Sequence, residues 1–386
     1  MFRNDSYVVD STLFGTYGDF IGGVLGTIFT IISVFFLLVT FRHQRIVTKD
    51  NHKQMETQRF NDLFFELLHL YQSEVDELCG SSQIIDSMEK KDDGKIRVQG
   101  KDWNYNNKDY FDFEKEKIQK KYRNRKSYIE NIKQSVNYYM LFYIENRSKI
   151  GAYFRTLYRI YELIDCSSEI SEKQKKEYSK IVRAQLTESE LFFIRYNAMT
   201  IYGKSFVKYI NKYNILKHLP AFELLEFKDW WGKDNNSPGL NIVEREGVNI
   251  IYSLITKSLK DVFKQSSSND YDYMVTLMPD DDAKYQISMA LKQHYDFMIT
   301  ITIKNKATIF TREFMGFKKM DEKRIQQLFD CFLKEIFMYS NFHQFNNLGD
   351  EDFYSKPIVT QNNVTTIICG VKTKNNEPLK IKFSNN

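Results

Sequence analysis

The chain has 386 residues, which suggests one or two globular domains besides any membrane anchor. Hydrophobic residues make up 42% and aromatic residues 15% of it, ample material for a packed core. The net charge of +5 arises from 55 basic and 50 acidic residues, and this balance is too even to indicate a nucleic-acid-binding protein by itself.

The most apolar segment is residues 20–41, FIGGVLGTIFTIISVFFLLVTF, which contains no charged residue. As a helix, these 22 residues would span roughly 33 Å, about the thickness of the hydrocarbon core of a bilayer. A cleaved signal peptide is the alternative, but the run is too long and basic residues follow it instead of a cleavage site. Because basic flanks stay in the cytoplasm, we expect a single-pass membrane protein with residues 1–19 outside and 42–386 in the cytoplasm.

Small residues line one face of the predicted membrane helix: Gly22, Gly26, Thr30 and Ser33. Small residues four positions apart let two helices approach closely, so this face is a candidate oligomerisation surface between copies of the chain. The alternative is that glycine is simply common in membrane helices. Because no ionisable residue lies inside the span, one copy offers no ion path, and a pore would need several copies.

Helical periodicity continues beyond the membrane segment. Apolar residues at spacings of three and four predict a helix over about 54–79 that runs on from the span, and its apolar stripe favours a core face over a coil between subunits. Glycine, asparagine and aspartate in 80–111 predict a loop or small hairpin. Capping boxes at Ser171 and Thr187 then begin further helices, which completes a mainly α-helical cytoplasmic domain over 42–228.

Turn residues at 234–239 mark a boundary, beyond which helical and alternating patterns mix. Periodicity predicts helices over 250–263 and 325–337, and strands over 273–278, 298–303, 308–314, 364–371 and 379–383. We therefore expect a C-terminal α+β domain over 240–386 with a small antiparallel sheet, which would act as a sensor or bind a partner. The chain as a whole is mainly α.

The sequence shows no catalytic constellation. Gly203-Lys204-Ser205 lacks the earlier glycine and the preceding strand of a phosphate-binding loop. The aspartates at 280–282 have no partner carboxylate motif and suit a solvated turn. The histidines form no pair or triad, and the four cysteines form no metal-binding pair. We therefore expect no catalytic residue, no metal and no cofactor, and we favour a function that is not enzymatic.

Arginines supply the remaining candidate site. Arg155 and Arg159 are four residues apart on one helical face, and Arg183 and Arg195 are further candidates. Together they could bind an anionic ligand or RNA through charge-assisted hydrogen bonds. The alternative is that these arginines form structural salt bridges with nearby acids such as Glu162.

A resemblance to a known family depends on four segments, which are residues 18–27, 59–69, 153–159 and 178–197. Their order and spacing resemble those of the putative phage abortive infection proteins, an AbiC-like membrane family of bacteria. The resemblance covers residues 1–228 and implies a role in phage defence at the bacterial inner membrane, but it supplies no catalytic residues. Members often carry an additional hydrophobic segment nearer the N-terminus. Residues 1–16 hold nothing long enough to span, so a single span is expected here.

Three functions fit these observations. The favoured one is a membrane-anchored effector of bacterial anti-phage, or abortive infection, defence that oligomerises and disrupts the membrane when a phage-derived trigger is sensed. The second is a membrane-tethered nuclease or other toxin enzyme. The third is a non-enzymatic sensor or scaffold that recruits another defence protein. The expected partners are membrane lipid, further copies of the chain, and a second defence protein or nucleic acid.

Overall fold

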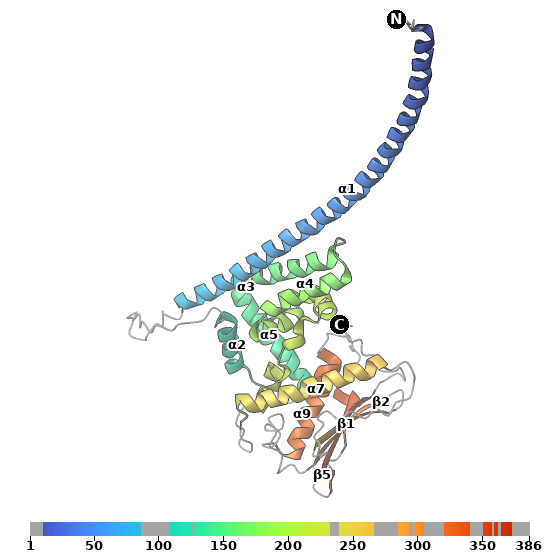
Figure 1. The fold of residues 1–386 in the computed structure, drawn as a ribbon. Helices are drawn as coiled ribbons and strands as arrows, with labels where there is room; N and C mark the ends of the chain where they lie inside the picture. Colours follow the sequence, from blue (N-terminus) through green and yellow to red (C-terminus); the bar gives the residue numbers. More distant parts are fainter. Residues whose placement is uncertain are drawn as a thin grey trace, which may run out of the picture. The chain divides into compact units, whose positions relative to one another are not determined.

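The computed structural model describes residues 11–85, 109–124, 127–231, 239–265, 285–292, 296–304, 320–339, 350–356, 359–361 and 364–372. These residues divide between two compact units, Met1–Glu66 with Ser167–Ser171 and Leu67–Cys166 with Glu172–Asn386. Helices dominate, as the sequence predicts, and an antiparallel sheet lies near the C-terminal end of the chain (Figure 1).

Helix α1, Ser11–Ile85, is 75 residues long and contains both the apolar segment and the helix predicted over 54–79 (Figure 1). The prediction that the second runs on from the first is therefore confirmed. The loop predicted over 80–111 is wrong for 80–85, because a single glycine costs a helix only about 1 kcal/mol relative to alanine. It is also wrong for 109–111, which begin a further helix. Residues 86–108 of that predicted loop lie outside the described residues. Tyr71 and Leu78 of the apolar stripe are buried, which supports a core role for that part.

The second unit has a helical core centred on α5. The helices of this core are α2 (Asp109–Lys121), α3 (Tyr128–Cys166), α4 (Glu172–Gln185), α5 (Glu188–Ala198) and α6 (Val207–Tyr213). Four 3₁₀ turns accompany them: η1 (Lys204–Phe206), η2 (Ile215–His218), η3 (Ala221–Glu223) and η4 (Leu225–Trp230). The predicted capping box at Thr187 is confirmed, since Thr187 and Glu190 each accept a hydrogen bond from the other's backbone N–H. All residues of α5 from Ser189 onward are buried, so α5 is enclosed on every side.

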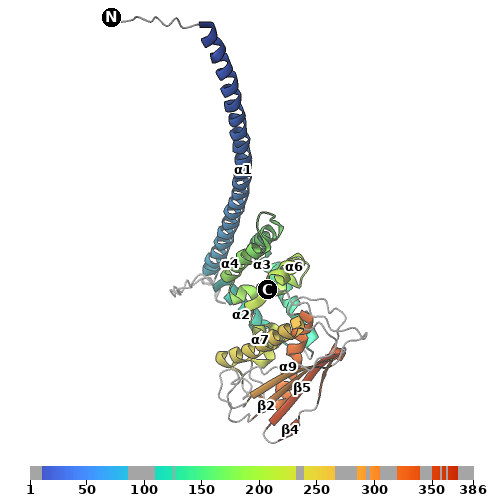
Figure 2. The same ribbon diagram turned by 45° about the vertical axis from the view of Figure 1, so that its right-hand side comes forward.

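The C-terminal part combines two helices with a sheet. Helix α7 covers Ile242–Gln265, and α9 (Glu322–Lys334) continues into one π-helical turn, Glu335–Tyr339. The strands are β1 (Tyr285–Lys292), β2 (Asp296–Lys304), β3 (Phe353–Ser355), β4 (Val359–Gln361) and β5 (Val364–Lys372). They pair in the order β1-β2-β5-β3, with β4 also on β5, and every pairing is antiparallel. Helix α9 packs against β5 and β3 (Figure 2).

The helices predicted over 250–263 and 325–337 and the strands predicted over 298–303 and 364–371 are confirmed. Strand β1 was missed, and β5 pairs with β2, β3 and β4 in the described part of the sheet. The strands predicted at 273–278, 308–314 and 379–383 lie outside the described residues, as do positions 232–238, which hold most of the predicted boundary turn.

Gly203 is required by close packing rather than by phosphate binding. It lies at the start of η1, and a Cβ atom there would be 2.4 Å from the carbonyl oxygen of Asn197 and 2.1 Å from its Oδ1. Because the backbone oxygen cannot rotate aside, we expect Gly203→Ala to lower the free energy of unfolding by about 1–3 kcal/mol. Urea unfolding of the purified full chain, followed by circular dichroism, measures this loss.

Gly151→Ala is the matched control. In α3 its Cβ would lie 3.1 Å from Nη1 of Arg155, the far end of a flexible side chain that can move. Alanine is also the better helix residue, so we expect no loss of stability. Equal unfolding free energies for Gly203→Ala and the wild type would contradict the close-packing role.

Candidate functional site

The apolar part of α1 is exposed along its whole length. Every residue of 20–41 is exposed, and the helix includes an 18-residue window with a mean hydropathy of 2.5. By length and composition, this helix is long and apolar enough to cross a membrane. Monomeric soluble proteins rarely expose an apolar surface of this size. The segment therefore needs lipid or another apolar surface to cover it.

The threonine hydroxyls of this segment are satisfied within the helix itself. Thr27 Oγ1 donates to the Gly23 carbonyl at 2.6 Å, and Thr30 Oγ1 donates to the Gly26 carbonyl at 2.7 Å. Such internal hydrogen bonds reduce the free-energy cost of placing a hydroxyl in hydrocarbon. A threonine in this span is thus compatible with a lipid environment.

The small-residue face is open. A Cβ atom built at Gly22 or Gly26 would meet no other atom within 4 Å, and Thr30 and Ser33 are exposed. The four residues therefore form a surface that a second helix could approach closely. That a second copy occupies it stays a prediction.

Three of the four candidate arginines lie on α3 and α4 and make different contacts. Arg155 and Arg159 are exposed on α3, and Arg159 forms an ion pair with Glu162. Arg183, on α4, donates from Nη1 to the carbonyls of Tyr213 at 3.3 Å and Asn214 at 3.2 Å. Arg159 thus has the salt bridge that the structural alternative expects, while Arg183 satisfies carbonyls at the C-terminal end of α6. Binding of an anion or RNA by these residues stays a prediction.

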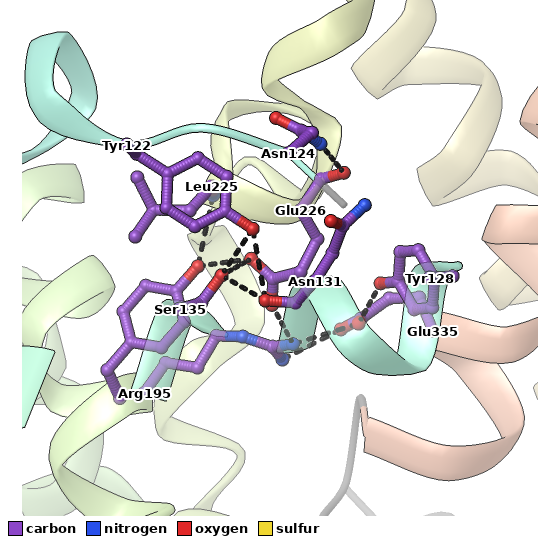
Figure 3. A network of polar contacts seen from close by, with 10 residues as sticks. Tyr122, Asn124, Tyr128, Asn131, Ser135, Arg195, Leu225, Glu226 and Glu335 are labelled. Atoms are coloured by element: carbon purple, nitrogen blue, oxygen red, sulfur yellow. Dashed lines mark hydrogen bonds and ion pairs between the residues drawn. The ribbon is translucent and has the colours of Figure 1, made fainter. Parts of the chain in front are cut away.

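Arg195 lies inside a buried polar network (Figure 3). Its Nη1 is 2.7 Å from Glu335 Oε1, and its Nη2 donates to Glu335 Oε2 at 2.8 Å, which makes a bidentate ion pair. The same Nη2 donates to Glu226 Oε1 at 3.4 Å. The three side chains are 1%, 2% and 0% exposed, in the order Arg195, Glu335 and Glu226. Arg195 is therefore not available to an external anion, unlike the exposed arginines.

Hydroxyl groups complete the coordination of both carboxylates. Tyr128 donates to Glu335 Oε2 at 2.7 Å, while Tyr196 and Ser135 donate to Glu226 Oε2, Ser135 at 3.3 Å (Figure 3). The Tyr196 oxygen in turn accepts the backbone N–H of Leu225 at 3.0 Å. The network thus joins α3, α5 and η4 to the end of α9.

The charges in the network do not balance, because one guanidinium faces two carboxyl groups. Burial raises the pKa of Glu226 above its ordinary value, even though Arg195 acts to lower it. The buried phenols of Tyr128 and Tyr196 have pKa values far above their usual range, mainly because of burial, and so act as hydrogen-bond donors. The arrangement suits structural pairing and offers no activated nucleophile.

The described residues contain no group of three or more His, Cys, Asp or Glu side chains arranged to hold a metal ion. All four cysteines are free thiols, and burial raises the pKa of the Cys331 and Cys369 thiols to about 12. Thiols with such pKa values are poor nucleophiles at neutral pH. The aspartates at 280–282 lie outside the described residues.

Residues 145–224 match a family model described as putative phage abortive infection protein. The resemblance predicted for residues 1–228 is thus confirmed over this stretch, which runs from within α3 to the end of η3. Arg195 lies inside the matched stretch, whereas Glu226, Glu335 and the apolar segment lie outside it. Searches of curated proteins and of solved structures gave no match.

Proposed function

We propose, from the match of residues 145–224 to the phage abortive infection family, that this chain is a membrane-anchored effector of bacterial anti-phage defence. In this proposal residues 20–41 cross the inner membrane once. Basic residues follow the span and acidic residues precede it, which favours an N-terminus outside the cytoplasm and a cytoplasmic location for the remainder.

The exposed apolar helix is the observation that carries the mechanism. Its surface has no cover within the described chain, and its Gly22 and Gly26 face leaves room for a second helix. Copies of the chain would associate through this face after infection, and the clustered helices would make the bilayer leaky. Since the span holds no ionisable residue, leakage requires several copies.

A membrane-potential dye tests the mechanism during infection. Cells that express the full chain are expected to depolarise after phage addition and before lysis, while uninfected expressing cells keep their potential. Infected cells without the protein are the control for depolarisation caused by the phage alone. Protection with an unchanged potential would exclude membrane disruption and would point to an anchored enzyme or a scaffold.

A further inference from the structure

Basic side chains form a stripe along α1 directly after the apolar segment. The stripe consists of Arg42, Arg45, Lys49 and Lys53. Their spacings of three, four and four residues place them within an arc of about 80° on one face of the helix, because successive residues turn by about 100°. Asp50, the single acid between residues 42 and 53, points about 100° away from Lys49.

All four side chains of the basic stripe are exposed, and no ion pair within the described part of the chain involves any of them. The nearby Glu56 instead lies 3.2 Å from His52. The stripe thus presents cations that are not neutralised by the described residues of the chain itself.

The stripe lies on a shallow groove that is apolar at one end and cationic at the other. Leu38 and Phe41 line the end that belongs to the apolar segment, and the four basic residues line the remainder with Gln44, Thr48, His52 and Glu56. A phospholipid matches this arrangement, because its acyl chain suits the apolar end of the groove and its phosphate suits the cationic end. Continuity with the apolar segment therefore favours lipid over a soluble anion.

We infer that the basic stripe is a binding surface for anionic phospholipid headgroups, and this inference rests on the membrane location in the proposed function. Arg42 and Arg45 are the first basic residues of α1 beyond the hydrocarbon core, at the depth where lipid phosphates lie. Lys49 and Lys53 are roughly 10–17 Å further along the helix axis, and their long stems let the ammonium groups reach back toward the headgroups. Acidic lipid would gather on one side of α1.

Native mass spectrometry of the full chain in mixed micelles tests the inference. With equal amounts of phosphatidylglycerol and phosphatidylethanolamine, we expect the wild type to retain about threefold more of the anionic lipid, because each nearby cation favours an anionic headgroup. The variant Arg45→Gln, Lys49→Gln, Lys53→Gln keeps only Arg42 of the stripe and should lose most of this preference. If this variant preferred phosphatidylglycerol over phosphatidylethanolamine as strongly as the wild type does, the inference would be overturned.

A charge-moved variant separates the stripe from net charge. Arg45→Val with Val47→Arg and Lys49→Asn with Asn51→Lys keeps the composition but moves two cations to the face of α1 opposite the stripe, at positions that do not line the groove. We expect this variant to lose most of the preference, and an unchanged preference would show that position on the stripe is irrelevant.

Carbonate extraction of cell membranes distinguishes the possible failures. The wild type and all variants are expected to stay in the membrane pellet. Release of the wild type by carbonate would overturn both the membrane anchor and the inference, whereas an integral protein without lipid preference would overturn the inference alone.

Discussion

Arg195→Met is expected to lower the free energy of unfolding by about 3–5 kcal/mol, the usual effect of removing one partner from a buried ion pair. Methionine fills similar volume but leaves Glu226 and Glu335 side by side without a cation. Both carboxyl groups are almost fully buried, so water cannot take the place of the guanidinium. Thermal unfolding of the purified full chain in detergent measures this loss of stability. In cells, the variant is expected to accumulate to a lower level than the wild type.

Glu226→Gln is the matched control for this prediction. Glutamine keeps an oxygen that accepts from Tyr196 and Ser135, and it removes the charge in excess of the Arg195–Glu335 pair. We expect a change of less than about 1 kcal/mol, because a raised pKa already shows that burial disfavours the charged form of Glu226. Equal free energies of unfolding for Arg195→Met and Glu226→Gln would contradict the prediction that the bidentate Arg195–Glu335 ion pair is the main stabilising contact of the network.

The Arg195–Glu335 pair also connects two parts of the sequence. Arg195 belongs to the stretch that matches the abortive infection family, and Glu335 begins the π-helical turn after α9. Interruptions of this kind within helices are frequent at functional sites. Because Arg195 lies on α5, the pair connects the end of α9 to that enclosed helix.

One feature of the sequence indicates the buried network, namely charged residues within apolar runs. Arg195 and Glu226 each interrupt a run of apolar residues, LFFIRYNA and AFELLEF, where a charge is buried only if it is paired. The sequence could not show which acid pairs with which base. Glu335 is 140 positions from Arg195, and only the packing of α9 brings the two together.

Helix periodicity was the reliable signal, and strand patterns were weaker. The stripes of α7 and α9 place apolar residues on one face over several turns, so local sequence is enough to predict them. The sequence of strand β1 alternates equally well, with apolar residues at positions 285, 287, 289 and 291. Alanine, leucine and methionine in the same segment favour a helix, so local sequence does not predict this strand. The segment is a strand in the structure because it pairs with β2.

Gly22→Leu and Gly26→Leu should each abolish protection against phage if α1 forms the assembly surface. A leucine side chain on this face would hold two helices apart and weaken their association by about tenfold or more. Neither change disturbs the single chain, since no atom lies within 4 Å of either Cβ position. Leucine also favours helix and lipid, so membrane insertion is preserved. Plating efficiency and the mass of the detergent-solubilised complex measure the two effects.

Val24→Leu separates this interface from a general effect of bulk in the span. Position 24 is two residues from both glycines, about 200° around the helix, so the added methylene lies on the opposite face. We expect this variant to keep both the complex and the protection. Loss of protection in all three variants would mean that the span tolerates no added volume anywhere. Full protection in the glycine variants, with an unchanged complex, would leave residues 20–41 as an anchor and would place the harmful activity in the remainder of the chain.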